Sequence, residues 1–231
     1  MITESDRKYL MRKKAELVDG CPKCHGRSAH CDCAKLLSLE FSKIKANIPE
    51  MYREFTLEQL DHPELEDKKA LLKRYENALL TGAAKDLLLT GSSGTAKSSV
   101  AAALLVKMLQ ARKTCYFFNS ALVVKDVLTS VWDKHVEPDP RLQILKNADL
   151  IVIDNFNIIM TIPAMIRALI TDTLRTREMY GKRTIIIMNG VTIDKITAET
   201  LSALNLTKIQ LVGFDYKEKI LKVTRRTKNG K

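Results

Sequence analysis

The sequence has few aromatic residues and no long apolar run. Phe, Trp and Tyr make up 6% of its 231 residues, and no stretch alternates basic with aromatic residues, so no base-stacking surface for nucleic acid is indicated. No apolar run approaches the ~20 residues that span a bilayer. Residues 1–14, MITESDRKYLMRKK, contain no apolar segment of the signal-peptide type. These absences predict a cytoplasmic protein with no membrane partner.

Acidic residues are also under-represented, and the net charge is +11 with a pI near 9.4. The excess is concentrated at the end of the chain, where Lys217 to Lys231 include seven basic residues and one acidic residue. A phosphate backbone is one partner that such a segment attracts, because lysine and arginine displace its counterions. A solvated tail without a partner is an equally good interpretation.

From Lys85 onward, short apolar runs alternate with helical patterns. Near-continuous apolar strands alternating with helices predict a parallel sheet that is covered on both faces, as in a doubly wound α/β domain. The chain is long enough for one such domain and a small appendage. The apolar runs lie at 86–91, 115–119, 150–154, 184–189 and 208–213, and the helical patterns at 97–111, 120–134, 162–180 and 193–201.

The N-terminal part has a different pattern. Polar residues 3–18 favour a short helix, a cysteine cluster follows at 21–33, and helical spacing returns at 34–48. We therefore predict four segments: a helical and zinc-binding module at 1–47, a linker and helix at 48–82, the nucleotide-binding domain at 83–216, and a basic tail at 217–231.

The stretch LLLTGSSGTAKSSVAAALL predicts a phosphate-binding loop between a strand and a helix. Backbone N–H groups of such a turn, at a helix N-terminus, form a concave anion site. Lys97 is expected to reach the β- and γ-phosphates of a nucleotide, and Ser98 to coordinate Mg²⁺. An ordinary Ser/Gly turn is the alternative. The predicted nucleotide-binding residues are Gly91, Ser92, Ser93, Gly94, Thr95, Ala96, Lys97, Ser98 and Ser99.

The run LIVID ends in Asp154, and the next residue is Asn155 rather than a glutamate. Ligands of open α/β sheets bind beyond the carboxyl ends of the strands, where Gly91, Asp154 and Asn189 are all expected. Asp154 is the predicted Mg²⁺ ligand, and Asn189 is either a γ-phosphate contact or a simple turn residue. Asn155 can orient a water but cannot take its proton, so we expect ATP binding with weak or partner-dependent hydrolysis.

Four of the five cysteines lie close together in CPKCHGRSAHCDC. Four thiolates at this spacing satisfy tetrahedral zinc, and metal binding is favoured over disulfides in a cytosolic protein. His25 and His30 are alternative ligands for one position, and Cys115, in an apolar run, is expected in the core. The predicted zinc ligands are Cys21, Cys24, Cys31 and Cys33.

Taken together, these motifs resemble the DnaC/IstB-like group of AAA+ ATPases. CPKCHG…CDC, ANIPEMYREFTLEQL, GSSGTAKSS, ADLIVIDN, TIIIMNG and LVGFDYKEK occur in the family's order along nearly the whole chain. The resemblance implies a P-loop NTPase of the AAA+ fold that binds ATP and forms oligomers. It also implies single-stranded DNA and a replicative helicase or a transposase as partners.

Three residues depart from the family pattern. Ala96 replaces a glycine of the phosphate loop, as in the alanine-lysine-serine version that minichromosome-maintenance helicases show, and Asn155 replaces the catalytic glutamate. Ala203 stands where the family has an arginine that serves the neighbouring subunit's ATP. In GTPase systems, loss of an arginine with this role lowers the rate by ~10³–10⁵. Arg175 and Arg177 are candidate substitutes, although surface charges are the alternative.

These features favour a helicase loader or replication accessory protein, acting as a homo-oligomer or beside an active paralogue. An IstB-type transposition helper is the first alternative, against which the zinc module weighs. A non-catalytic adaptor with a structural nucleotide is the second.

Overall fold

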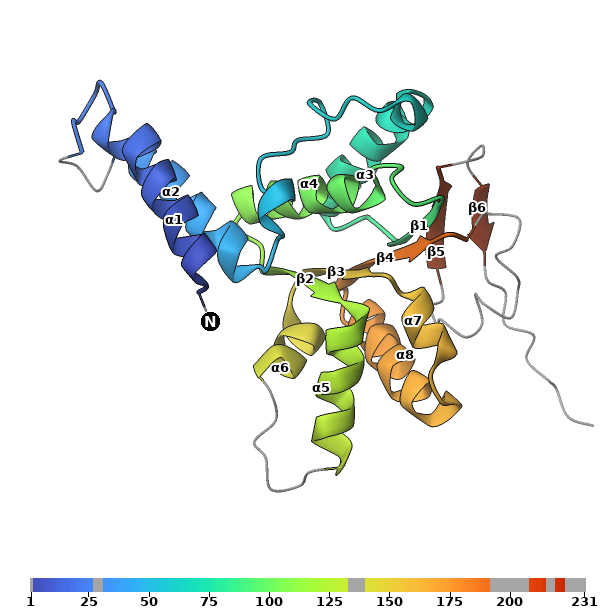
Figure 1. Ribbon diagram of the computed structural model, residues 1–231. Coiled ribbons are helices and arrows are strands. Elements are labelled where there is room, and N and C mark those ends of the chain that lie inside the picture. Colours follow the sequence, from blue (N-terminus) through green and yellow to red (C-terminus); the bar gives the residue numbers. More distant parts are fainter. Residues whose placement is uncertain (1, 27–30, 133–139, 192–207, 215–218, 223–231) are drawn as a thin grey trace, which may run out of the picture.

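The structure is a computed structural model and describes residues 2–26, 31–132, 140–191, 208–214 and 219–222. Its centre is one six-stranded sheet with helices on both faces (Figure 1). The strands are β1 (Asp86–Gly91), β2 (Cys115–Asn119), β3 (Leu150–Asp154), β4 (Arg183–Asn189), β5 (Lys208–Gly213) and β6 (Lys219–Lys222). Their order in the sheet is β2-β3-β4-β1-β5-β6. All neighbouring pairs are parallel except β5 and β6.

The predicted parallel sheet flanked by helices is confirmed. Four strands have the predicted bounds, and β4 begins one residue earlier than expected, at Arg183. The sequence pattern does not predict β6, because its four residues, KILK, form no apolar run. The predicted helix at 193–201 lies outside the described residues.

Successive strand residues point to opposite faces, so each strand contributes to two cores. Leu87 and Leu89 pack with α3 (Lys69–Thr81) and α4 (Lys97–Gln110) on one face. Leu88 packs on the other face with four helices. These helices are α5 (Ser120–Trp132), α6 (Pro140–Asn147), α7 (Asn157–Thr161) and α8 (Ala164–Met179). None of the helices in the described ranges is long and apolar enough to cross a membrane.

The N-terminal residues form an antiparallel helical hairpin that extends away from the sheet (Figure 1). Its first arm is α1 (Glu4–Lys14), continued by a π-helical turn, η1 (Ala15–Asp19), and its second arm is α2 (Asp32–Lys45). Thr3 starts α1 with a reciprocal cap, in which Thr3 Oγ1 accepts from the Asp6 N–H and the Asp6 carboxylate accepts from the Thr3 N–H. The cysteine cluster lies at the far end of the hairpin.

The segment after α2 joins the core of the sheet domain. The Ala46 carbonyl accepts from the Phe117 N–H at 2.8 Å, and Asn47 Nδ2 donates to the Phe117 carbonyl at 2.8 Å, so this segment pairs with the edge strand β2. Further on lie two 3-10 turns, η2 (Glu50–Tyr52) and η3 (Pro63–Lys68). Leu57 and Leu65 share the core of Leu87. The predicted segment boundaries stay a prediction, but residues 48–82 are packed against the sheet domain.

A buried ion pair connects the hairpin to this segment. Arg53 is 5% exposed; its Nη2 donates to Asp6 Oδ1 at 2.7 Å and its Nε to the Ile48 carbonyl at 2.9 Å. The guanidinium also lies 4.9 Å from the centre of the Tyr9 ring. Because α1 supplies Asp6 and Tyr9, Arg53 fixes the direction in which the hairpin leaves the domain.

Asp86 is the first residue of β1, and its buried carboxyl group lies at the end of that strand away from the phosphate loop. Its Oδ1 accepts from the Thr184 N–H at 2.6 Å, while its Oδ2 has no hydrogen-bond partner within the part of the chain that is described. Burial raises the pKa of Asp86 to about 7, although the Thr184 N–H opposes the shift.

We expect Asp86→Asn to stabilise the protein increasingly with pH. The pKa of Asp86 is higher in the folded than in the unfolded protein. Its contribution to the free energy of unfolding is therefore fully present below about pH 4 and is lost as the pH rises through about 7. Asparagine keeps the acceptor for Thr184 without the charge. Urea unfolding should show a gain of about 2–4 kcal/mol at pH 8 and a much smaller gain at pH 4.

Asp149→Asn is the matched control, for which we expect a change in the free energy of unfolding of the opposite sign. Although burial raises the pKa of Asp149, hydrogen bonds from Lys182 and Thr114 hold it at about 2. This variant should therefore lose stability at neutral pH. If the free energy of unfolding depended on pH in the same way for wild type and Asp86→Asn, Asp86 would not titrate as described.

Candidate functional site

The predicted phosphate loop lies between β1 and α4. Gly91 and Gly94 have positive φ angles of 131° and 81°, which glycine adopts at no steric cost. Lys97 begins α4 and is 2% exposed. Its Nζ donates to Thr95 Oγ1 at 2.8 Å and to the Ser92 carbonyl, so the ammonium lies inside the loop. Strand, loop and helix follow in the predicted order, while nucleotide binding itself stays a prediction.

Ala96 precedes α4 in the left-handed conformation, with φ 60° and ψ 12°. An L-residue with a Cβ pays roughly 1–2 kcal/mol there relative to glycine. Ala96 therefore occupies a conformation that glycine, the residue of the common phosphate-loop pattern, would adopt without this cost.

We expect Ala96→Gly to stabilise the fold. Relief of left-handed strain should exceed the larger unfolded-state entropy of glycine, leaving a net gain of roughly 0.5–1 kcal/mol, or about 1–4 °C in Tm. The control is Ala102→Gly in the middle of α4, which should cost about 1 kcal/mol. Thermal unfolding of both variants checks this, and a loss of stability in Ala96→Gly would contradict the strain.

A cluster of hydrogen-bonded side chains lies beside the loop and centres on Asp154, at the end of β3. Ser98 Oγ donates to Asp154 Oδ2 at 2.8 Å. Asp154 Oδ1 accepts from the Asn155 N–H at 2.7 Å and from Asn189 Nδ2 at 3.3 Å. Ser120 Oγ, from α5, donates to the Asp154 carbonyl at 2.6 Å. The predicted residues of three elements thus meet at one rim of the sheet, and their roles stay predictions.

The cluster offers suitable ligands for Mg²⁺. Mg²⁺ prefers oxygen ligands and is commonly held by one or two carboxylates together with substrate phosphates. The Ser98 hydroxyl and the Asp154 carboxylate supply two oxygens 2.8 Å apart, next to the phosphate loop. The residues present therefore fit the metal that the sequence predicts.

Asn155 occupies a backbone conformation that glutamate rarely adopts. Its φ is 57°, and asparagine is among the few non-glycine residues that visit this region routinely. Its Oδ1 accepts from Asn189 Nδ2 at 2.6 Å, so the two asparagines are joined directly. The sequence pattern alone does not reveal this conformation. The conformation is a structural reason for an asparagine at position 155, in addition to the side chain's lack of basicity.

Arg177, one of the two candidates for an arginine acting in trans, is buried between elements of this chain. Arg177 is 1% exposed, and its guanidinium donates to the carbonyls of Leu145 at 2.8 Å and Arg183 at 2.7 Å. It therefore holds α6 and β4 to α8, and the part it could play in a neighbouring subunit stays a prediction. Arg175 is half-buried and stays a candidate. Ala203 lies outside the described residues.

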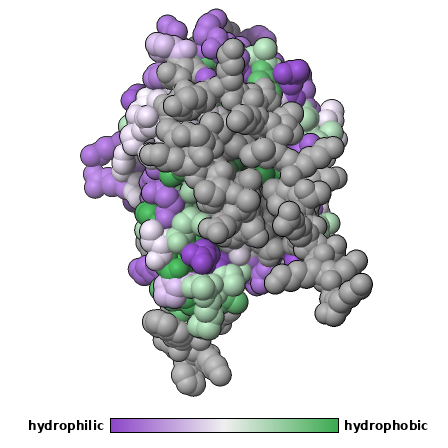
Figure 2. All heavy atoms as spheres, turned by 90° about the vertical axis from the view of Figure 1, so that its right-hand side faces the viewer, coloured by the Kyte–Doolittle hydropathy of each residue, from purple (hydrophilic) through white to green (hydrophobic). Residues whose placement is uncertain are grey.

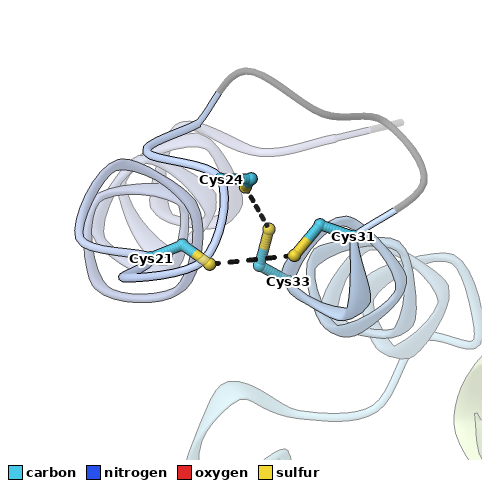
Figure 3. A group of neighbouring side chains, drawn as sticks. All are labelled: Cys21, Cys24, Cys31 and Cys33. Carbon is cyan, nitrogen blue, oxygen red and sulfur yellow. Dashed lines mark hydrogen bonds between the residues drawn. The ribbon is translucent and has the colours of Figure 1, made fainter.

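The four predicted zinc ligands converge at the end of the hairpin (Figure 3). Their Sγ atoms all lie within 4.8 Å of one another, with 3.8 Å between Cys21 and Cys31 and 3.4 Å between Cys24 and Cys33. Tetrahedral zinc with Zn–S bonds of ~2.3 Å places its sulfur ligands roughly 3.8 Å apart. The thiols therefore fit a zinc ion. His30 lies outside the described residues, and Cys115 is buried in β2, where burial raises its pKa to about 12.

Removal of zinc should unfold the far half of the hairpin. Few apolar side chains of the hairpin are buried, and Cys21 and Cys33 are two of them, so the metal would supply most of the stability there. We expect one zinc per chain by mass spectrometry, and loss of helical circular dichroism on chelation. Cys24→Ser should lose the metal, whereas the control Cys115→Ser should keep it. A hairpin that stays helical without zinc would contradict the assignment.

Comparison with known proteins supports the same fold. No family model matches the sequence, and no curated protein matches it. AMPPCP-bound DnaA from Aquifex aeolicus has a TM-score of 0.57 and 14% identity, over 72% of this chain and 50% of that chain. The DnaC helicase loader has a TM-score of 0.55 and 18% identity, over 71% of this chain and 99% of that chain. DnaI has a TM-score of 0.56 and 15% identity, over 71% and 93% of the two chains.

The chain therefore has the AAA+ fold of the DnaC type, and the resemblance seen in the sequence is confirmed at the level of the fold. The chain spans about half the length of the DnaA structure.

Proposed function

We propose that this protein is an ATP-binding DNA replication accessory protein of the helicase-loader type, with weak or partner-dependent ATP hydrolysis. One observation carries the proposal: a phosphate loop with a buried lysine faces a Ser98–Asp154–Asn189 cluster, in which Asn155 takes the place of a base. The fold shared with DnaC and DnaI supports the replication context.

The residues of the site have distinct tasks in this proposal. The loop N–H groups and Lys97 would bind the phosphates, and Ser98 and Asp154 would hold Mg²⁺, which when bound would neutralise charge on the phosphate oxygens. Asn189 and Asn155 orient the γ-phosphate and a water by their amides. Of the described residues joined by these hydrogen bonds, Asp154 alone carries a carboxylate, and this carboxylate would be a ligand of the metal. Proton removal from water is therefore the missing step, worth typically ~10²–10⁴ in rate.

The hairpin is the proposed contact for a replicative helicase. It extends from the domain (Figure 1) and leaves Met11 and Leu36 72% and 48% exposed. Single-stranded DNA is the second proposed partner, supported by the net charge of +11 and by the likeness to DnaA, one structure of which holds single-stranded DNA.

Assembly with a second AAA+ subunit is supported by the surface next to the site. On the face in Figure 2, apolar side chains gather in the lower part, over α7 and the start of α8. Ile158 and Met165 are 38% and 65% exposed there, and α7 begins two residues after Asn155. A neighbouring copy or a paralogue would bury this surface and approach the nucleotide.

ATP hydrolysis by matched variants tests the proposal. We expect wild type to bind ATP with slow steady-state turnover, Lys97→Ala to lose binding, and Asn155→Glu to hydrolyse ATP roughly 10²-fold faster than wild type. Asn155→Gln is the control, because it has the size of glutamate and the same backbone strain without the basicity. Equal rates for the glutamate and glutamine variants, or fast turnover by wild type, would contradict the role given to Asn155.

Co-purification with the replicative helicase of the same host, with and without ATP, tests the partner. Loss of binding in Cys24→Ser would support the hairpin as the contact, and no binding by wild type would contradict the loader function. A non-catalytic adaptor is the second candidate, favoured by Asn155. It predicts normal helicase binding by a folded Lys97→Ala.

A further inference from the structure

A cavity of about 340 Å³ lies at the start of β1, at the end of the strand away from the phosphate loop. Asp86 and Gly91 are the two ends of β1, and the extended strand separates them by roughly 16 Å. The cavity is therefore distinct from the nucleotide site, and it has the size of a small-molecule pocket. Its lining comes from the segment that leads into β1, the end of α8 and the start of β4: residues 83–86, Glu178, Met179 and Arg183.

Asp86 brings an acceptor without a protein partner to this cavity. The residue is 1% exposed. Its Oδ1 accepts from the Thr184 N–H, whereas its Oδ2 has no hydrogen-bond partner among the residues that the structure describes. Buried polar atoms are normally hydrogen-bonded, because an unpaired one costs free energy. Since Asp86 is part of the lining, a ligand in the cavity that carries an N–H group can donate to Oδ2.

The side-chain donors around Asp86 are directed to the backbone instead. Burial and the charge of Asp86 raise the pKa of Tyr75, so the two side chains are close, yet Tyr75 Oη donates to the Lys85 carbonyl at 2.7 Å. Arg183 acts on Asp86 through its charge, but its Nε and Nη1 donate to two backbone carbonyls at 2.6 and 3.1 Å. These bonds hold the walls of the cavity together and leave Oδ2 to a ligand.

Charges of both signs line the cavity. Asp86 and Glu178 are acidic, and Lys85 and Arg183 are basic. A ligand with a single charge would be attracted by one pair and repelled by the other. A ligand with both charges can place each group beside its opposite. Met179 adds apolar surface for a short carbon chain. The lining is therefore complementary to a small zwitterion.

We propose that this cavity is a second ligand site of the protein and binds a small zwitterion of the α-amino acid type. The ammonium group of the ligand donates to Asp86 Oδ2, its carboxylate lies toward Lys85 and Arg183, and its side chain lies against Met179. This inference does not depend on the proposed binding of ATP.

Ligand-observed NMR with the standard protein amino acids, each added separately to the zinc-replete chain, tests the site. We expect saturable binding by at least one of them, unchanged by Mg·ATP. For each that binds, the amine without the carboxylate and the acid without the amino group should bind at least about tenfold more weakly. The N-trimethylated form should also bind at least about tenfold more weakly, because it keeps both charges but cannot donate a hydrogen bond.

Asp86→Asn tests the contact to the ammonium group. One amide oxygen still accepts from Thr184, but an NH₂ group takes the place of Oδ2, so the affinity should fall at least about tenfold. Asp61→Asn is the matched control, because Asp61 is exposed and does not line the cavity. It should bind within about twofold of wild type. Lys85→Met should weaken binding by the loss of a charge beside the carboxylate, and urea unfolding confirms that each variant is folded.

The pH dependence of affinity is a second readout. Burial, and then the charge of Glu178, raise the pKa of Asp86 to about 7, while a backbone N–H of β4 and two arginines oppose the shift. Below this pKa Asp86 must release its proton to bind an ammonium group, so wild-type affinity should rise about tenfold between pH 6 and pH 8. Affinity of Asp86→Asn should stay level. The charged and titratable groups around Asp86 are Tyr75, Lys85, Arg177, Glu178 and Arg183.

Four results would overturn the proposal. Absence of saturable binding by any of the amino acids would leave Oδ2 to water. Equal affinity of wild type and Asp86→Asn, or competition with Mg·ATP, would place the ligand elsewhere. An amine that binds as tightly as its amino acid would exclude the zwitterion. Wild type that binds an amino acid at this site but no ATP would support this inference while contradicting the proposed function.

Discussion

The carboxylate of Asp154 is the contact on which the arrangement of the candidate site depends. One oxygen accepts from Ser98, in the first turn of α4, and the other from Asn189, at the end of β4. The carbonyl of the same residue accepts from Ser120 of α5. A single residue thus aligns the phosphate-loop helix, two neighbouring strands and a helix of the opposite face. Such a cluster needs little rearrangement to accept a metal ion and a phosphate.

Backbone conformation is unusual at two of the residues that depart from the family pattern. Ala96 and Asn155 both have positive φ angles, of 60° and 57°. At Ala96 the left-handed conformation is strained, and the buried Lys97 and the helix that follows hold it in place. At Asn155 the conformation suits the side chain, and the amide bonds to Asn189. Under the proposed function, such a site would bind nucleotide with a reduced capacity for proton transfer.

Much of the fold could be predicted from the sequence, because buried parallel strands are continuous apolar runs. LIVID and TIIIMN therefore indicated β3 and β4, and the cysteine spacing indicated a cluster that the structure brings together. The surroundings of Arg177 could not be predicted, because sequence spacing does not show that three carbonyl oxygens and a hydroxyl surround its guanidinium.

The most direct test of this account is the chemical state of ATP bound to the isolated protein. Zinc-replete wild type in excess over Mg·ATP is quenched at intervals, and the bound nucleotide is separated and quantified. The account predicts that nearly all of it remains ATP over many minutes, because Asn155 cannot accept the proton of the attacking water. Conversion of the bound nucleotide to ADP within seconds would show that another group serves as the base, and would contradict the central claim.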